Sequence, residues 1–320
     1  MASEFYCPHC YKQVRAHELL YFKPSCGEKL PPPTPTLLQK MGVSPAPASM
    51  TCTKSNKAGC QKCNRRLNFR ACPICKGSIP SGMEGAPIII AVTGAPGAGK
   101  SSYVQAATEQ LRKLSEIFHW TLMQCDAGNG RNSLFLLRRS HSDKGRLIAL
   151  AEMAEDALTP NVMSALSGII VLVDPLQVEP VREEIQASGN IPLPAFAAAE
   201  PQRLVTRVAR GAASLPLAIT LSKLDVLVAS DVGHTGRWFL KSDERLVCRD
   251  SVSRGKLAKD ELETISCEME SWIATAYPAI LPASKPLEKC RFFGCSTAAP
   301  ALRVEDPLLW ILSVCKVANS

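Results

Sequence analysis

One short segment constrains the fold of this chain more than any other, and it reads Gly94-Ala95-Pro96-Gly97-Ala98-Gly99-Lys100-Ser101. It matches the phosphate-loop pattern G-x-x-x-x-G-K-[ST] at every fixed position. The apolar run Ile88 to Val92 precedes it and predicts a strand, and the stretch Ser102 to Leu114 follows it and predicts a helix. This order is typical of a loop whose backbone N–H groups surround a phosphate. We therefore expect the chain to bind a nucleoside triphosphate.

The residues of this loop have distinct expected tasks. Lys100 would reach the β- and γ-phosphates, and the Ser101 hydroxyl would ligate Mg²⁺. Both are also candidate catalytic residues, together with Asp126. The expected phosphate-binding residues are Gly94, Ala95, Pro96, Gly97, Ala98, Gly99, Lys100, Ser101 and Ser102.

Charge and cysteine are distributed unevenly along the 320 residues. Residues 1–80 contain 12 Lys/Arg against 3 Asp/Glu, and 8 of the 14 cysteines lie within the first 75 residues. A Pro-rich stretch, residues 31–49, interrupts this head and predicts an extended linker or loop. We expect two domains: a cysteine-rich module over residues 1–80 and a nucleotide-binding domain over residues 84–320. The sequence has no apolar run long enough to span a membrane and no secretory signal, so a cytoplasmic protein is expected.

Two Cys-x-x-Cys pairs, Cys60 with Cys63 and Cys72 with Cys75, predict a structural Zn²⁺ site. A short module with few aliphatic residues gains folding free energy from such a metal. Further cysteines offer ligands for a second zinc site, with His9 and His17 as substitutes, and the two sites could interleave. These further ligands are Cys7, Cys10, Cys26 and Cys52.

The basic residues of this head allow two interpretations. Residues 51–76 contain seven Lys/Arg and no acid, a composition that nucleic-acid-binding zinc ribbons share. The positive charge also offsets the negative charge of the Cys₄–Zn²⁺ sites, and Phe69 is the one aromatic residue there for base stacking. We favour charge compensation and keep nucleic-acid binding through residues 1–80 open.

Apolar runs alternate with helical patterns beyond residue 84, which predicts an α/β domain with a mostly parallel sheet between helices. The expected strands are 88–92, 119–125, 168–173, 217–221 and 291–295, and the expected helices are 102–114, 144–158, 261–276 and one from Asp306. Together with the loop at residues 94–101, this order predicts the three-layer fold of P-loop NTPases.

Two segments at expected strand ends predict guanine recognition. Ser222-Lys223-Leu224-Asp225 resembles the [NT]-K-x-D motif, in which a carboxylate accepts both N1–H and N2–H of guanine. Lys223 would lay its stem across the base. Cys295-Ser296-Thr297-Ala298 occupies the place of the S-A-K loop of GTPases, so Ser296 and Thr297 join the expected guanine site.

The acid that supports Mg²⁺ is expected at another strand end. Asp126 follows the expected strand 119–125 and is the preferred candidate, although Asp126-Ala127-Gly128 departs from D-x-x-G. Asp174 ends the strand 168–173 and is the alternative, as in a Walker B motif. The interval between Ser101 and Asp126 leaves little room for a switch loop. Arg131, Arg138 and Arg139 could supply an internal cation to the γ-phosphate, although Arg138 and Arg139 are also typical of a solvated helix face.

The chain resembles the bacterial double-GTPase family of the translation-factor-related (TRAFAC) class. The matching segments are 5–10, 72–75 with 79–80, the P-loop, 170–177, 216–225 and 303–310. The resemblance implies a GTPase domain, an N-terminal zinc-ribbon head and a setting in conflict or defence systems.

These observations together predict a GTP-binding protein with Mg²⁺ and one or two Zn²⁺ ions. We expect a slow or partner-activated GTPase that passes its nucleotide state to a protein partner. Two alternatives stay open: an interaction module that binds GTP without hydrolysis, and an ATP-dependent enzyme that uses Asp174.

Overall fold

The computed structural model describes residues 4–22, 69–80, 82–125, 132–139, 145–188, 200–229, 252–253, 256–298 and 301–317. The chain divides into two compact units. The first comprises residues 1–89 with 120–150, and the second comprises residues 90–119 with 151–320.

The first unit contains a small cysteine-rich head built from short antiparallel strands. One pair of strands and one set of three form it, and Phe5, Val14 and Ile79 pack in its core beside the buried Cys7 and Cys72. The elements of the head are β1 (Glu4–Tyr6), β2 (Gln13–Arg15), η1 (Ala16–Glu18), β3 (Leu20–Phe22), β4 (Phe69–Ala71) and β5 (Ser78–Ile79). A core this small provides little hydrophobic stabilisation by itself.

The first unit also carries two longer antiparallel strands, β7 (Trp120–Cys125) and β8 (Asn132–Arg139). Most of β9 (Gly145–Glu152) belongs to it as well. Seven strands are hydrogen-bonded in the order β14-β11-β10-β6-β9-β8-β7.

The second unit is built on parallel strands. β6 (Ile88–Gly94), β10 (Gly168–Val173), β11 (Leu217–Leu221) and β14 (Cys290–Gly294) are neighbours, and each adjacent pair among β6-β10-β11-β14 is parallel. All side chains of β10 and β11 are buried, as expected for strands covered on both faces. The register places the carboxyl ends of all four strands at one edge. Ligands of open α/β sheets bind at this edge.

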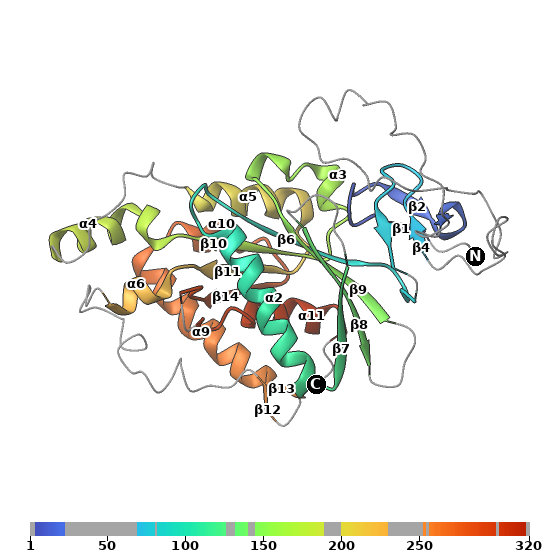
Figure 1. Cartoon of the computed structure of the whole chain (residues 1–320). Coiled ribbons are helices and arrows are strands. Elements are labelled where there is room, and N and C mark those ends of the chain that lie inside the picture. The colour runs from blue at the N-terminus through green and yellow to red at the C-terminus, as the bar shows by residue number, and fades with distance from the viewer. Residues whose placement is uncertain are drawn as a thin grey trace. The chain divides into compact units, whose positions relative to one another are not determined.

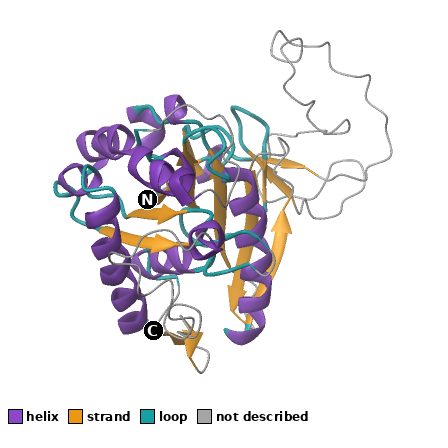
Figure 2. Ribbon diagram, turned by 90° about the vertical axis from the view of Figure 1, so that its left-hand side faces the viewer, coloured by secondary structure: helices purple, strands orange, loops and turns teal. Residues whose placement is uncertain are grey.

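Helices cover both sides of these strands (Figure 2), and α2 (Lys100–Ile117) lies across the near face in Figure 1. On α9 (Lys259–Ala276) the buried residues Leu262, Ile265, Met269 and Trp272 recur at helical spacing and form one apolar stripe. The other helices and short strands are η2 (Glu155–Ala157), α3 (Pro160–Met163), η3 (Pro175–Gln177), α4 (Glu179–Ser188), α5 (Pro201–Ala212), α6 (Leu224–Ala229), β12 (Val252–Ser253), β13 (Lys256–Leu257), α9 (Lys259–Ala276), α10 (Ile280–Ser284) and α11 (Asp306–Val314).

The α/β class with a mostly parallel sheet is confirmed, and one expected helix is wrong. Residues 144–158 were expected to be helical because Ala, Leu, Glu and Met favour helices. The structure has strand β9 at Gly145–Glu152 instead, followed by η2. Leu147 to Ala151 are all buried, so both faces of this segment are covered, and burial inside a sheet overrides the local preference.

This change alters which strand lies next to the phosphate loop. The expected strand at 119–125 does exist as β7, but it ends the strand order and pairs with β8. The direct neighbour of β6 on that side is β9.

Among the described residues, no helix is both long enough and apolar enough to cross a membrane.

Candidate functional site

The glycine loop between β6 and α2 has the backbone of a phosphate-binding loop. Gly97 and Gly99 have φ values of 81° and 87°, in the left-handed region that side chains disfavour. Gly99 is the N-cap of α2, so the helix starts at Lys100. The unpaired N–H groups at this end and the helix dipole favour an anion there.

Lys100 lies within the loop that it is expected to serve. Its ammonium group donates hydrogen bonds to the carbonyl oxygens of Gly94 and Ala95, at 2.9 and 3.0 Å. These bonds hold the charge beside the loop. A flexible lysine side chain can exchange two carbonyl partners for phosphate oxygens, because each offers comparable hydrogen bonds and phosphate adds opposite charge.

Ser101, the expected Mg²⁺ ligand, is paired with an acid that the sequence analysis missed. Its hydroxyl donates a hydrogen bond to Oε2 of Glu152, at 2.8 Å. Glu152 is the last residue of β9, and Met153 beyond it donates its N–H to the carbonyl of Val92 in β6. A hydroxyl and a carboxylate side by side at a phosphate loop are hard oxygen donors of the kind that Mg²⁺ prefers.

The acid that the structure places beside Ser101 is Glu152, a candidate other than Asp126. Asp126 lies outside the described residues, and β7 before it is not the strand next to β6. The acid was missed because residues 144–158 were interpreted as a helix. The unbroken apolar run Leu147 to Ala151, ending in an acid, is the signal that a buried strand and its strand-end carboxylate give.

The stretch of chain between Ser101 and Glu152 is longer than the interval expected between Ser101 and Asp126. After α2 the chain forms the antiparallel pair β7–β8 before it reaches β9. Arg138 lies on β8 opposite Thr121, so the expected helix face at residues 138 and 139 is wrong. Arg131 lies outside the described residues.

The two segments expected to recognise guanine lie together. The Ser296 hydroxyl donates to Oδ1 of Asp225 at 2.5 Å, and the Leu224 N–H donates to the carbonyl of Cys295 at 3.0 Å. Asp225 is exposed, whereas Ser296 is buried. One oxygen of the carboxylate is thus fixed by the protein while the side chain reaches solvent at the carboxyl edge of the sheet.

Lys223 makes a contact that the sequence did not predict. Its ammonium group forms an ion pair with Oδ2 of Asp174 at 2.6 Å, and Oδ1 of Asp174 accepts the N–H of Leu176. The Asp174 side chain is fully buried. Both oxygens of this alternative Mg²⁺ acid are therefore engaged within the protein.

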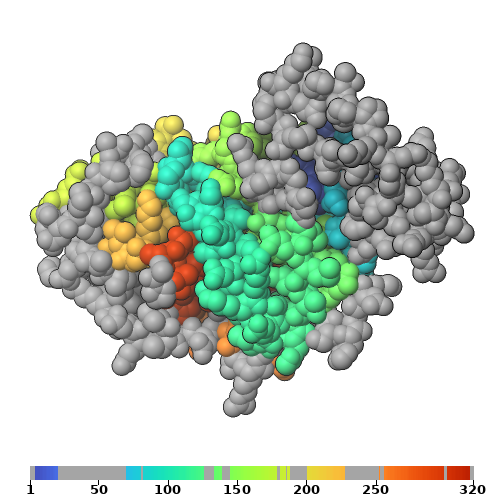
Figure 3. All heavy atoms as spheres, in the orientation of Figure 1, coloured from blue at the N-terminus to red at the C-terminus, as the bar shows by residue number. Residues whose placement is uncertain are grey.

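The remaining expected residues have different surroundings. Ser222 is buried, and its hydroxyl donates to the carbonyl of Val173. Thr297 is exposed and lines a groove with Ser102 and Gln105 of α2. In Figure 3 the red atoms of the C-terminal part of the chain lie beside the start of α2 on this face.

The comparisons with known proteins give remote similarities. No protein-family model matches the chain. A curated relative, SaeC of Mycolicibacterium smegmatis, is 25% identical over 211 residues, and its name proposes a role in ESX-1 scaffolding and assembly. The match covers 53% of this chain and 54% of SaeC, so the chain spans about half the length of this relative.

Two solved structures are similar to this chain at low identity. One is a GTP-binding protein from Sulfolobus solfataricus in complex with GDP, with 13% identity and a TM-score of 0.33, covering 71% of this chain and 53% of that chain. The other is translation elongation factor SelB from Methanococcus maripaludis, with 11% identity and a TM-score of 0.30, covering 73% of this chain and 34% of that chain.

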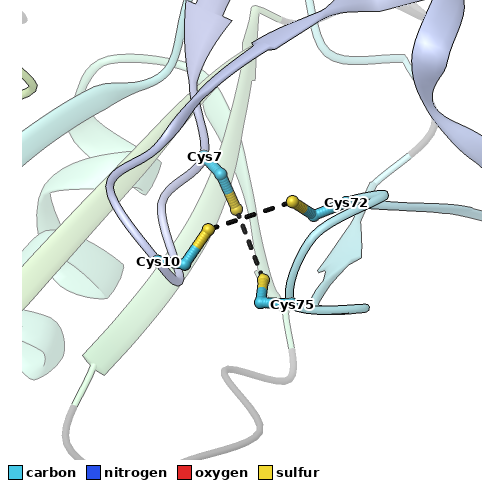
Figure 4. Close-up of side chains that lie close together, drawn as sticks. All are labelled: Cys7, Cys10, Cys72 and Cys75. Carbon is cyan, nitrogen blue, oxygen red and sulfur yellow. Dashed lines mark hydrogen bonds between the residues drawn. The ribbon is translucent and has the colours of Figure 1, made fainter.

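A second candidate site lies in the cysteine-rich head. The sulfur atoms of Cys7, Cys10, Cys72 and Cys75 all lie within 4.8 Å of one another, and Figure 4 shows them pointing toward a common centre. Two of the sulfur pairs are 3.8 and 3.9 Å apart. A tetrahedron with metal–sulfur bonds of about 2.3 Å has edges of about 3.8 Å, so the four thiols fit Zn²⁺.

The two Cys-x-x-Cys turns have the same local structure. Cys7 and Cys72 are each followed by a proline, and the residues after Cys10 and Cys75, Tyr11 and Lys76, both have positive φ. In each turn a backbone N–H also donates to a cysteine sulfur, from His9 to Cys7 and from Gly77 to Cys75. Such N–H···S bonds stabilise thiolates, the form that binds metal.

The crowding of the thiols changes their proton affinities. Hydrogen bonding from Cys7 lowers the pKa of Cys10 to about 7, and hydrogen bonding from Cys10 lowers the pKa of Cys72. Hydrogen bonding with Cys10 raises the pKa of Cys7 and of Cys75, because a thiol that donates to a neighbouring thiolate holds its own proton more tightly.

The ligand set differs from the one favoured by spacing. We expected Cys72 and Cys75 to join Cys60 and Cys63, but the structure joins them to Cys7 and Cys10, as in the interleaved arrangement. The reason is the sheet β3-β4-β5, which pairs the chain before and after the intervening segment and so closes the distance. Cys26, Cys52, Cys60 and Cys63 lie outside the described residues.

Proposed function

We propose that this protein binds GTP with Mg²⁺ at the carboxyl edge of its sheet. The observation that carries the proposal is the pairing of Asp225 with Ser296, at the same edge as the glycine loop. A phosphate loop alone accepts any nucleoside triphosphate, whereas an exposed carboxylate fixed by a hydroxyl selects a base with adjacent N–H donors. Guanine has such donors at N1 and N2, and adenine does not.

An exchange at Asp225 tests this proposal. Asp225→Asn removes an acceptor for two guanine N–H groups, and one charge-assisted hydrogen bond is worth about 1.5–3 kcal/mol. We expect GTP affinity to fall roughly ten- to 150-fold. Xanthosine triphosphate should gain affinity, because its 2-oxo group accepts from the new amide. Equilibrium titration with fluorescent nucleotides measures both.

The matched control is Asp260→Asn, which changes an exposed acid in the first turn of α9. It should leave both affinities unchanged. If Asp225→Asn binds GTP as tightly as the parent protein does, the guanine proposal is wrong.

We further propose that Glu152, through Ser101, supports the Mg²⁺ that accompanies the triphosphate. Glu152→Gln keeps the size of the side chain but removes its charge. We expect the Mg²⁺ concentration for half-maximal GTP binding to rise about tenfold, as for one lost charge-assisted bond of about 1.5 kcal/mol. Binding measured without Mg²⁺ should not change.

Glu116→Gln is the control for this variant, since it changes an exposed acid in the last turn of α2, far along the helix from Ser101. Asp126→Asn tests the earlier expectation directly. If Asp126→Asn raises the Mg²⁺ concentration for half-maximal GTP binding and Glu152→Gln leaves it unchanged, Asp126 and not Glu152 supports the Mg²⁺.

The double-GTPase resemblance supports a coupling role. We propose a cytoplasmic protein, in a conflict or defence system, whose nucleotide state is passed to a protein partner. Hydrolysis is proposed to be slow or partner-activated, because Met153 and Ala154 after Glu152 carry no group that orients water. The use of Asp174 in an ATP-dependent enzyme is less favoured, since Lys223 and Leu176 occupy its carboxylate.

A further inference from the structure

The turn that follows β10 lies between the two loops of the proposed nucleotide site. β10 is hydrogen-bonded to β6 on one side and to β11 on the other. Leu172 is in register with Gly94, and Val173 with Leu221, so the three strands end together. The residues after β10, Asp174 to Gln177, therefore emerge between the phosphate loop and residues 222–225, where β11 leads into α6.

Asp174, at one end of this turn, holds residues 222–225, the segment proposed to bind guanine. The fully buried carboxylate of Asp174 pairs with the Lys223 ammonium at 2.6 Å. Lys223 has a φ of 53°, a left-handed conformation that is uncommon for lysine. A buried carboxylate requires a partner, so the ion pair fixes the loop in this conformation two residues before Asp225.

The other end of the turn holds the phosphate loop. Gln177 is 3% exposed, and its Nε2 donates to the carbonyl oxygen of Pro96 at 2.7 Å. In a trans peptide the C=O and the next N–H point in opposite directions. Fixing the Pro96 carbonyl toward Gln177 therefore turns the Gly97 N–H away from Gln177. A phosphate loop needs its N–H groups held in such fixed directions.

We propose that the turn 174–177 positions both loops and links them, with Asp174 acting on base recognition and Gln177 acting on phosphate binding. The inference rests on the proposed GTP site and assigns two positioning residues to it. It also gives Asp174 a task other than metal binding. Neither residue contacts the nucleotide; each acts through a loop that does.

The two ends of the turn predict different binding defects. Gln177→Met keeps the volume of the side chain and removes the donor, so GTP and inosine triphosphate should lose affinity equally, about five- to tenfold. Asp174→Asn releases the loop before Asp225. Inosine triphosphate lacks the 2-amino group, whose N–H would donate a hydrogen bond to Asp225. This variant should therefore lose GTP affinity, and its preference for GTP over inosine triphosphate should fall at least threefold.

The experiment measures both affinities and their Mg²⁺ dependence on the full chain. Gln202→Met is the matched control. This partly buried glutamine of α5 accepts a hydrogen bond from the Tyr277 hydroxyl and is not part of the turn 174–177. Equal losses for both nucleotides in Asp174→Asn, or a shifted Mg²⁺ dependence, overturn the proposal. If this variant does not fold, Asp174→Glu takes its place, because it keeps the charge but displaces the carboxylate from its position against the Lys223 ammonium.

Hydrogen exchange on the nucleotide-free chain separates this inference from the proposed function. We expect Gln177→Met to speed amide exchange at residues 97–100, and Asp174→Asn to speed it at residues 222–225. If the wild-type protein binds no GTP but the two variants show these exchange changes, the proposed function is refuted and the positioning role of the turn stands. Normal GTP binding with unchanged exchange in both variants refutes the turn's role alone.

Discussion

Replacing Lys100 by alanine should remove nearly all affinity for nucleoside triphosphates. In the structure the Lys100 ammonium is held at the glycine loop by the carbonyls of Gly94 and Ala95, so its charge is already at the site. Two charge-assisted bonds to β- and γ-phosphate oxygens, at about 1.5–3 kcal/mol each, correspond to a loss of roughly 10²- to 10⁴-fold. Isothermal titration with GTP in Mg²⁺ measures it.

The same helix offers the control. Lys113→Ala removes an exposed lysine from a later turn of α2 and should leave GTP affinity within about twofold of the parent value. The loss in Lys100→Ala should be larger for GTP than for GMP, which has no β- or γ-phosphate. Equal affinity of Lys100→Ala and the parent protein for GTP would show that the nucleotide binds elsewhere.

Much of the second unit could be predicted from the sequence, because its signals are strong and local. The phosphate loop has a fixed pattern of residues, and β10 and β11 are unbroken β-branched and aliphatic runs. The helices at 102–114 and 261–276 have clear apolar periodicity, and the structure extends each by a few residues. In such segments local preference and tertiary burial favour the same structure.

Strand β9 shows where the prediction failed. Its residues Leu147 to Ala151 favour a helix when considered alone, and Glu152 then falls within that helix rather than at a strand end. Its place beside β6 depends on hydrogen bonds to a strand far away in sequence, such as that from Met153 to Val92. One wrong element therefore left Glu152 out of the candidate Mg²⁺ acids, which were Asp126 and Asp174.

Ion pairs and metal ligand sets were harder still to predict. Nothing local in Ser222-Lys223-Leu224-Asp225 indicates that Lys223 pairs with Asp174, because the contact requires β10 and β11 to be neighbours. The partners of Cys72 and Cys75 likewise depend on the pairing of β3 with β4 across a long intervening segment. Sequence spacing alone favours the nearest Cys-x-x-Cys pair, here Cys60 with Cys63.

Removing the metal proposed for the cysteine cluster should unfold the head of the first unit. We propose that Cys7, Cys10, Cys72 and Cys75 hold one Zn²⁺, since their sulfur atoms match the edges of a ZnS₄ tetrahedron. The short strands β1 to β5 bury only a small core, and a structural zinc contributes about 10–16 kcal/mol of apparent binding free energy in modules of this kind. Cys72→Ser should lower the zinc content by one ion per chain.

The loss of metal should have a defined structural result. Amide protection at residues 4–22 and 69–80 should disappear in Cys72→Ser, while protection at the phosphate loop in the second unit persists. Cys267→Ser, which changes an exposed cysteine on α9, should retain full zinc content and protection. Elemental analysis and hydrogen exchange measure the two quantities on the same samples. Full zinc content in Cys72→Ser, or unchanged protection after zinc is lost, would contradict a structural ion at these four thiols, because a core this small cannot keep the head folded by apolar burial alone.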